Sequence, residues 1–139
     1  MVRWIGKEVS PLIQRFIELG EGYGDVFELC ELARLNRNRI HHAFLFTSKK
    51  EDKEYFSIAV ALKPINNANF FPIYICREGI PKSEAVPKRL SAFKETLEEL
   101  EIDPIQIDVK HSSTFVDTNL FYQYIIGVLR LNNLIPPLQ

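Results

Sequence analysis

The chain is poor in several residue types and patterns that mark particular classes of protein. It has two cysteines, one methionine and one tryptophan in 139 residues. Two cysteines cannot build a disulfide framework or a four-ligand zinc site, so we expect Cys30 and Cys76 to be reduced thiols packed inside the protein. The apolar runs fall short of the roughly 18 residues that a membrane-spanning helix needs.

Charge of one sign is also lacking, because the formal net charge is -1. A near-neutral chain has no general field that attracts nucleic acid or an anionic membrane, and we expect neither as a partner. The first residues lack the apolar region of a signal peptide, so we predict a cytoplasmic protein. Its length and 46% hydrophobic content predict one globular domain over residues 1–139.

Two helices are predicted at the start of the chain. Ser10 and Pro11 are typical of a helix N-terminus, and we favour a helix over residues 12–19, although the same residues also alternate as in a strand. A second helix follows from Asp25, with apolar residues at helical spacing, and Asn36 is a suitable left-handed stop.

Three strands, a helix, a strand and a final helix are predicted after residue 36. Strands are expected over residues 40–47, 55–62 and 70–76, a helix from 87, a strand over 105–109 and a helix over 118–131, capped by Asp117. The order α-α-β-β-β-α-β-α predicts an α/β (α+β) fold. Its helices would pack on a single mixed, mostly antiparallel sheet of about four strands.

Glycine is concentrated in a turn, where Gly20, Gly22 and Gly24 precede the second helix. A glycine-rich entry to a helix can bind phosphate, but four acidic residues flank this one and the lysine of a P-loop is missing. We favour a corner between two helices that needs positive φ, and keep a ligand-binding loop as the alternative.

Basic side chains gather after this helix, and Arg37 and Arg39 are candidates for holding a phosphate or an acidic partner. Arg77 and Gly79 are candidates because the element order coarsely resembles an acetyltransferase layout. There, a glycine-containing loop after the long strand cradles the cofactor pyrophosphate. This analogy implies a phosphorylated or coenzyme A-type ligand.

Catalytic motifs are weak. His111, Ser112 and Ser113 place an imidazole beside hydroxyls, but we favour a loop in which these groups satisfy the backbone. Asp108 and Lys110 form an acid-x-Lys pair like that of metal-dependent nucleases, on the wrong strand for that core. We predict no metal site and assign no catalytic residue.

Three stretches, residues 14–30, 72–81 and 122–137, resemble a family of short cytoplasmic proteins of unknown function from Gram-positive, spore-forming bacteria. Some relatives carry a sugar-kinase label, but this chain lacks a nucleotide loop and is too short for the two lobes of a kinase. The resemblance therefore implies compartment and size, and no activity.

The final helix is apolar over most of its circumference, and an apolar tail, residues 134–138, follows it. Such surfaces indicate an interface. We therefore predict a binding or protein-interaction module that is not an enzyme. Its partner would be another protein or a second copy of the chain, bound through the C-terminal helix and tail. The alternative is an enzyme or sensor for a small ligand.

Overall fold

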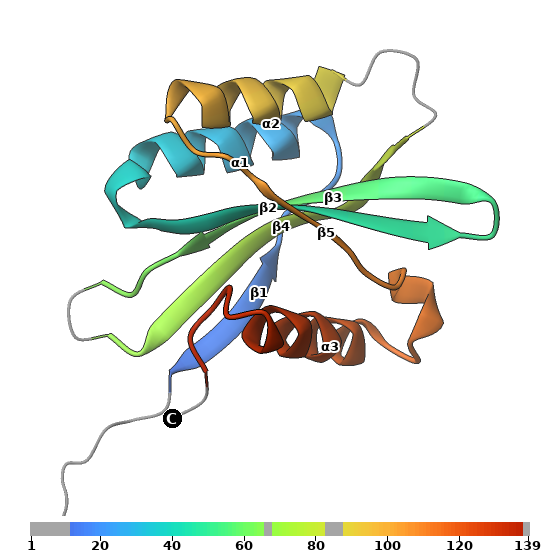
Figure 1. Cartoon of the computed structure of the whole chain (residues 1–139). Coiled ribbons are helices and arrows are strands. Elements are labelled where there is room, and N and C mark those ends of the chain that lie inside the picture. The colour runs from blue at the N-terminus through green and yellow to red at the C-terminus, as the bar shows by residue number, and fades with distance from the viewer. Residues whose placement is uncertain (1–11, 66–67, 83–87, 138–139) are drawn as a thin grey trace, which may run out of the picture.

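The computed structural model describes residues 12–65, 68–82 and 88–137. A five-stranded sheet carries helices on both faces (Figure 1). The strands are β1 (Ile13–Glu18), β2 (Ile40–Lys50), β3 (Lys53–Leu62), β4 (Phe70–Pro81) and β5 (Ile105–Asp108). The helices are α1 (Tyr23–Leu35), α2 (Lys88–Glu99) and α3 (Thr118–Leu131), with 3-10 turns η1 (Arg37–Arg39) and η2 (Ser112–Thr114).

The strand order across the sheet is β1-β4-β3-β2-β5. β1 is parallel to β4, β5 is parallel to β2, and β3 is antiparallel to both of its neighbours. Four strands therefore run in one direction, and only β3 opposes them. The carboxyl ends of β1, β2, β4 and β5 consequently meet at one edge of the sheet, which we call the carboxyl edge.

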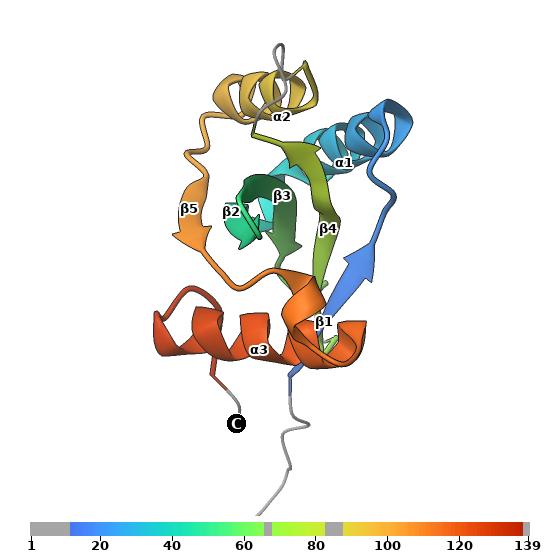
Figure 2. The same cartoon turned by 90° about the vertical axis from the view of Figure 1, so that its right-hand side faces the viewer.

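Two apolar layers hold the helices to the sheet. α1 and α2 cover one face and α3 the other (Figure 2). Alternate residues of each strand serve the two layers: in β3, Ile58 and Val60 face α1 and α2, whereas Ala59 and Ala61 face α3. The small side chains at 59 and 61 leave room for Phe44, Phe46 and Phe71 in the α3 layer.

The predicted strands over 40–47, 55–62, 70–76 and 105–109 and the predicted α1 and α3 are confirmed, with shifted ends. Asp117 caps α3 by accepting a hydrogen bond from the Leu120 N–H at 2.9 Å, as predicted. The predicted start of α2 at residue 87 lies outside the described residues, and the helix is described from Lys88. The left-handed conformation expected at Asn36 is wrong, because its φ is -113° and its side chain caps the Leu32 carbonyl instead.

The helix predicted over residues 12–19 is wrong, because Ile13–Glu18 form strand β1. Pairing with β4 decided between two patterns that the residues fit. Only a strand places Phe16 in the α3 layer while the alternate residues, such as Ile13, pair with β4 through their main chain. This strand also corrects the sheet. There are five strands instead of four, and two of the four strand pairs are parallel.

Candidate functional site

Polar side chains collect at the carboxyl edge, on the side of the sheet that α3 covers. The cluster draws on four segments: Glu18 ends β1, Ser48 lies near the end of β2, Glu78 lies in β4, and residues 111–113 follow β5. Ligand sites of open α/β sheets lie outside the carboxyl ends of their strands. The cluster is therefore the first place to look for chemistry.

A β-bulge in β4 creates the cluster. Phe56 pairs with Ile80 and Ile58 with Cys76, so three residues of β4, 77–79, stand opposite Ser57 alone. Glu78 takes a left-handed backbone with φ of 48°, and its N–H donates to Ser57 Oγ at 2.7 Å. Bulges and strained φ values concentrate near functional sites.

The carboxylate of Glu78 is only 8% exposed and accepts bonds from several donors. The Ser112 N–H donates to it at 2.7 Å and the Ser112 hydroxyl at 2.5 Å, while the Ser48 hydroxyl lies at 3.4 Å. Arg77 donates to the Ser112 Oγ at 2.8 Å and pairs with Glu18 at 2.6 Å. The bulge thus presents two consecutive side chains, 77 and 78, to the same loop.

The imidazole of His111 lies beside this carboxylate. Its Nε2 is 3.4 Å from Glu78 Oε1, and its Nδ1 accepts from the Ser113 N–H at 3.1 Å. A backbone N–H can only donate, so Nδ1 is unprotonated in the neutral ring and Nε2 carries the proton toward Glu78. The Ser113 hydroxyl, 2.9 Å from Nδ1, therefore donates its proton to the ring.

The sequence placed His111, Ser112 and Ser113 side by side, but the prediction favoured a plain loop and named no carboxylate partner. Asp108 precedes them in the chain, yet the group that reaches them is Glu78, 34 residues before Ser112. Its backbone conformation favours glycine, so a glutamate at position 78 gave no local signal. Only the pairing of the strands brings β4 to this loop.

The predicted ligand-binding residues fall at opposite edges of the sheet. Arg77 and Gly79 lie in the bulge, where Arg77 pairs with Glu18 and Gly79 contacts Glu21 of the β1–α1 turn. That turn holds Gly20 and Gly22, and Gly24 follows in the first turn of α1. Arg37 and Arg39 lie in η1, between α1 and β2, at the edge where β2 begins. Arg39 is bound to the Lys63 carbonyl at 2.8 Å. The structure therefore brings five of the seven candidates together and separates the two η1 arginines from them.

The glycine turn is a strand-to-helix corner, and none of the described glycines has positive φ, which corrects the predicted helix-to-helix corner. Glycine suits positions 20 and 79 because neighbouring residues approach their backbones closely. A side chain at Gly20 would overlap with the Asp25 carboxylate, and one at Gly79 would overlap with Glu21. Asp25 also accepts the Gly22 N–H at 3.0 Å, so a carboxylate of the chain itself already lies at the N-terminus of α1.

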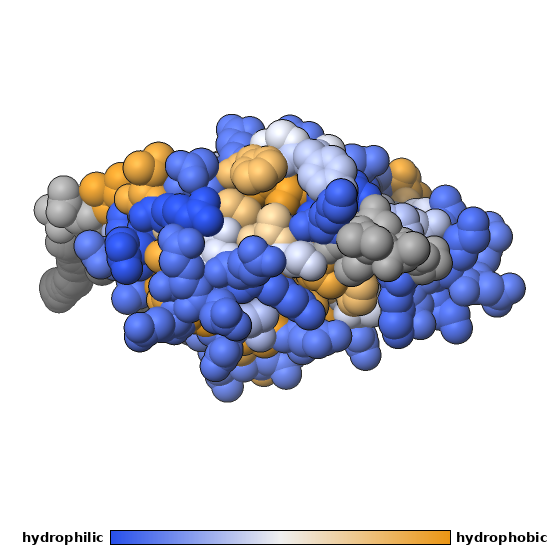
Figure 3. Space-filling model, turned by 90° about the horizontal axis from the view of Figure 1, so that it is seen from above, coloured by the Kyte–Doolittle hydropathy of each residue, from blue (hydrophilic) through white to orange (hydrophobic). Residues whose placement is uncertain are grey.

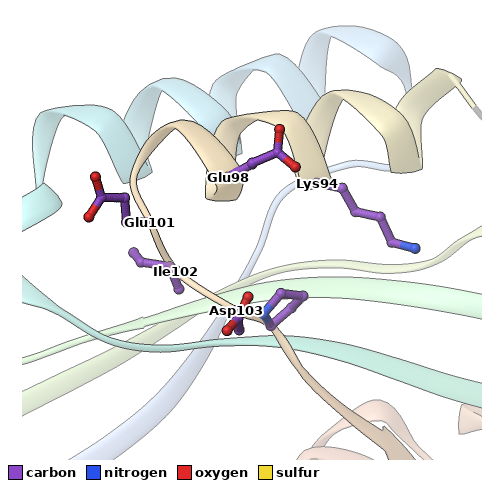
Figure 4. Close-up of a pocket in the computed structure, with 6 residues that line it drawn as sticks. Lys94, Glu98, Glu101, Ile102 and Asp103 are labelled. Atoms are coloured by element: carbon purple, nitrogen blue, oxygen red, sulfur yellow. The ribbon is translucent and has the colours of Figure 1, made fainter.

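Hollows also lie along the described surface, and the first of them borders the polar cluster at Ser48. The first, of about 340 Å³, is lined by Thr47, Ser48, Lys49, Glu54, Asp108 and Val109. A second, of about 320 Å³, lies below the end of α2, where Lys94 and Glu98 project from the helix and Asp103 from the following loop (Figure 4). No three His, Cys, Asp or Glu side chains converge for a metal within the described residues.

The third hollow, of about 390 Å³, is a groove between β1 and α3, and we call it the β1–α3 groove. It is lined by Gln14, Arg15, Phe16, Asn119, Tyr122, Gln123 and Ile126. Phe16 and Tyr122 stack at its base with ring centroids 4.5 Å apart. Burial raises the pKa of the Tyr122 phenol, and the nearby Glu18 carboxylate raises it further.

β1 forms one edge of the sheet (Figure 2). Its Ile13 N–H donates to Asn69 O, and Leu19 N–H, just beyond the strand, donates to Ile75 O. Alternate residues of a strand turn their main-chain groups to opposite sides, so those of Gln14, Phe16 and Glu18 point away from β4. No strand pairs with this outer side within residues 12–65, 68–82 and 88–137.

The outer face of α1 and α2 carries an exposed apolar area. Tyr23 and Phe27, one turn apart on α1, are 51% and 59% exposed. Figure 3 shows this face from above, with hydrophobic surface near its centre and at its left-hand end, and hydrophilic surface between and around these areas. Arg89 of α2 lies 5.8 Å from the centre of the Tyr23 ring. None of the described helices has the length and apolar character to cross a membrane.

Comparisons with known proteins give a family and no activity. No curated protein and no solved structure matches this chain. A family model described as "Domain of unknown function (DUF7147)" matches residues 12–135, which include every described strand and helix. The chain therefore belongs to the DUF7147 family.

Proposed function

We propose that this chain is a protein-interaction module that binds through the outer edge of β1, and that its partner is a second copy of the chain. One observation carries the proposal: β1 is a six-residue edge strand in unbroken register with β4, without a proline or a bulge. Edge strands that are not protected by such features pair readily with another chain. The opposite edge strand, β5, has only four residues.

A second copy matches this edge because β1 can pair with itself about a two-fold axis. In the antiparallel arrangement centred on Phe16, the outward main-chain groups of residues 14, 16 and 18 face those of residues 18, 16 and 14 of the partner. Antiparallel pairing is the more stable kind per residue, and two-fold dimers are the commonest oligomers. The pairing also covers Ile13, which is 44% exposed in the single chain.

The β1–α3 groove supports the same interface. It lies against the outer side of β1 and reaches α3 at Asn119 and Gln123, whose amides can hydrogen-bond to an added strand. The C-terminal tail has a different role: Ile135 is 3% exposed, and the Pro136 carbonyl accepts a bond from Gln14 at 2.6 Å. The tail therefore packs against β1 of its own chain. In the proposed dimer, the partner's strand contacts α3 and not the tail.

Sedimentation equilibrium over micromolar to millimolar concentrations tests the proposal. We expect a species of twice the 16.1 kDa chain mass. The double substitution Ile13→Lys and Ile17→Lys should return the protein to a monomer. Lysines at an exposed edge oppose strand pairing, and like charges directly opposite each other destabilise a strand pair.

The matched control is Leu35→Lys, at a position 81% exposed on α1 and distant from β1. This variant should remain a dimer. A wild-type protein that stays monomeric over the whole concentration range would overturn the proposal. So would a lysine double variant that dimerises as the wild type does. Deletion of residues 1–10 identifies any contribution of that segment, and loss of the dimer on deletion would assign the contact to those residues instead.

The alternative is a phosphorylated or coenzyme A-type ligand at Gly20, Gly22, Gly24, Arg77 and Gly79, and it has less support. Such a ligand would have to replace Glu18 at Arg77, Asp25 at Gly22 and Glu21 at Gly79. Thermal shifts with coenzyme A and inorganic phosphate test it, with Arg77→Ala as the comparison. The resemblance to proteins of spore-forming bacteria supports a bacterial, cytoplasmic setting for either function.

A further inference from the structure

The polar cluster contains one reactive arrangement that the proposed dimer does not use. We propose that Ser113 is a nucleophile that accepts acyl groups from esters or thioesters, with His111 as its general base and Glu78 as the residue that positions the base. The three groups come from two distant segments, η2 with its cap and the β4 bulge. None of the three groups lies in β1.

The order of donors and acceptors is that of an activated serine. The hydroxyl of Ser113 donates to His111 Nδ1 at 2.9 Å, and the opposite ring nitrogen, Nε2, faces the Glu78 carboxylate at 3.4 Å. The Ser113 N–H fixes this tautomer by donating to Nδ1. A serine, a base and a group that orients the base define nucleophilic catalysis by geometry, whatever their order in the chain.

The three residues differ in how far they are buried. The side chains of Glu78 and His111 are 8% and 11% exposed, whereas Ser113 is an exposed residue. The carboxylate and the imidazole are therefore held in a weakly solvated setting, where their attraction is stronger than in water. Ser113 is the exposed residue of the three, so a substrate can approach it from solvent.

The proposed step is acyl transfer to Ser113. The Oγ attacks the carbonyl carbon of the ester or thioester, and its proton passes to His111 Nδ1. The hydrogen bond from the Ser113 N–H to Nδ1 breaks as that nitrogen is protonated. The resulting imidazolium is stabilised by Glu78. Collapse of the tetrahedral intermediate breaks the bond to the leaving alkoxide or thiolate, which takes the proton from Nδ1. Water then releases the acyl group as a carboxylic acid by the same route.

A fluorophosphonate probe tests the nucleophile directly, because the serine Oγ displaces fluoride and the adduct is read by mass spectrometry. We expect one adduct per chain, mapped to Ser113 and abolished by Ser113→Ala. His111→Ala should slow labelling at least about 100-fold, and added imidazole should restore part of the rate. A purely structural role for His111 would not give this rescue. Glu78→Gln should slow labelling less than His111→Ala does.

Thr114→Ala is the matched control, since Thr114 is the next exposed hydroxyl and makes no bond to His111 through its side chain among the described contacts. This variant should label at the wild-type rate. The inference is overturned by an unlabelled wild-type protein, by labelling that persists in Ser113→Ala, or by equal labelling of His111→Ala and the wild type. Circular dichroism of each variant shows that the fold is kept, and Ser113→Ala, at an exposed position, leaves the packing untouched.

Discussion

Gly79 lies so close to Glu21 that the two residues join the β4 bulge to the β1–α1 turn. A Cβ at position 79 would overlap with the Glu21 side chain and would lie 3.2 Å from its Cα. Gly79→Ala should therefore destabilise the protein by about 1–3 kcal/mol, because an added methyl in a packed contact forces the backbone to move. Urea denaturation measures the loss.

Gly127→Ala is the control for this substitution. Gly127 lies within α3, and a Cβ there meets no atom within 4 Å. Alanine is the better helix former, so this change should stabilise the protein by about 0.5–1 kcal/mol. Equal effects at positions 79 and 127 would show that the contact with Glu21 does not constrain Gly79.

His41 and His42 predict how stability depends on pH. The two rings lie 4.5 Å apart, and burial lowers the pKa of both. The unfolded chain then binds more protons than the folded chain below about pH 6.5. Above that pH the two histidines should not reduce the free energy of unfolding. As pH falls below it toward the lowered pKa values, the free energy of unfolding should decrease.

Urea denaturation at neutral and mildly acidic pH measures this decrease. The double variant His41→Gln and His42→Gln should lose less stability between the two pH values than the wild type does. If both proteins lose the same amount, other groups titrate in this range and the histidines do not contribute.

Both cysteines should be unreactive in the folded protein. Cys30 and Cys76 are 1% and 3% exposed. Burial raises the pKa of both thiols, and that of Cys76 rises to about 12. The thiolate is the reactive form, so Ellman's reagent should modify neither in buffer and both in urea. Modification in buffer at the rate seen in urea would show that the α1–α2 layer opens.

Thr47 carries a hydroxyl whose oxygen is buried without a hydrogen-bond partner among the described residues. Valine has nearly the same shape and no hydroxyl to desolvate, and it suits a strand. Thr47→Val should therefore stabilise the protein by roughly 0.5–1 kcal/mol. Thermal denaturation measures the gain, and a loss of more than that amount would reveal a bond to Thr47 Oγ1.

The spacing of apolar residues predicted most helices and strands, because the apolar face of each of these elements packs into the core. β3 alternates between two layers, and α3 turns Phe121, Ile125 and Leu129 to the sheet, so local pattern and burial agree. β1 could not be predicted in this way. Its residues fit both a helix and a strand, and only β4, more than 50 residues away, decides between them.

The polar cluster also depends on strand pairing, which the sequence alone does not show. His111 and Ser113 are two residues apart, and the sequence shows that they can meet. The third member, Glu78, reaches them through a bulge that depends on the register between β3 and β4. No local pattern specifies such a bulge when its left-handed residue is a glutamate.

The place of β1 in the chain affects how the protein folds. β2, β3 and β4 form a meander of sequential neighbours, whereas Ile13 pairs with Phe70, 57 positions later. Closing the larger loop is slower, so we expect β1 to join the sheet after the meander has formed. Until then the edge of β4 is free. In concentrated solution the β1 of another molecule competes for it, which makes exchange of this strand the characteristic misfolding route of the chain.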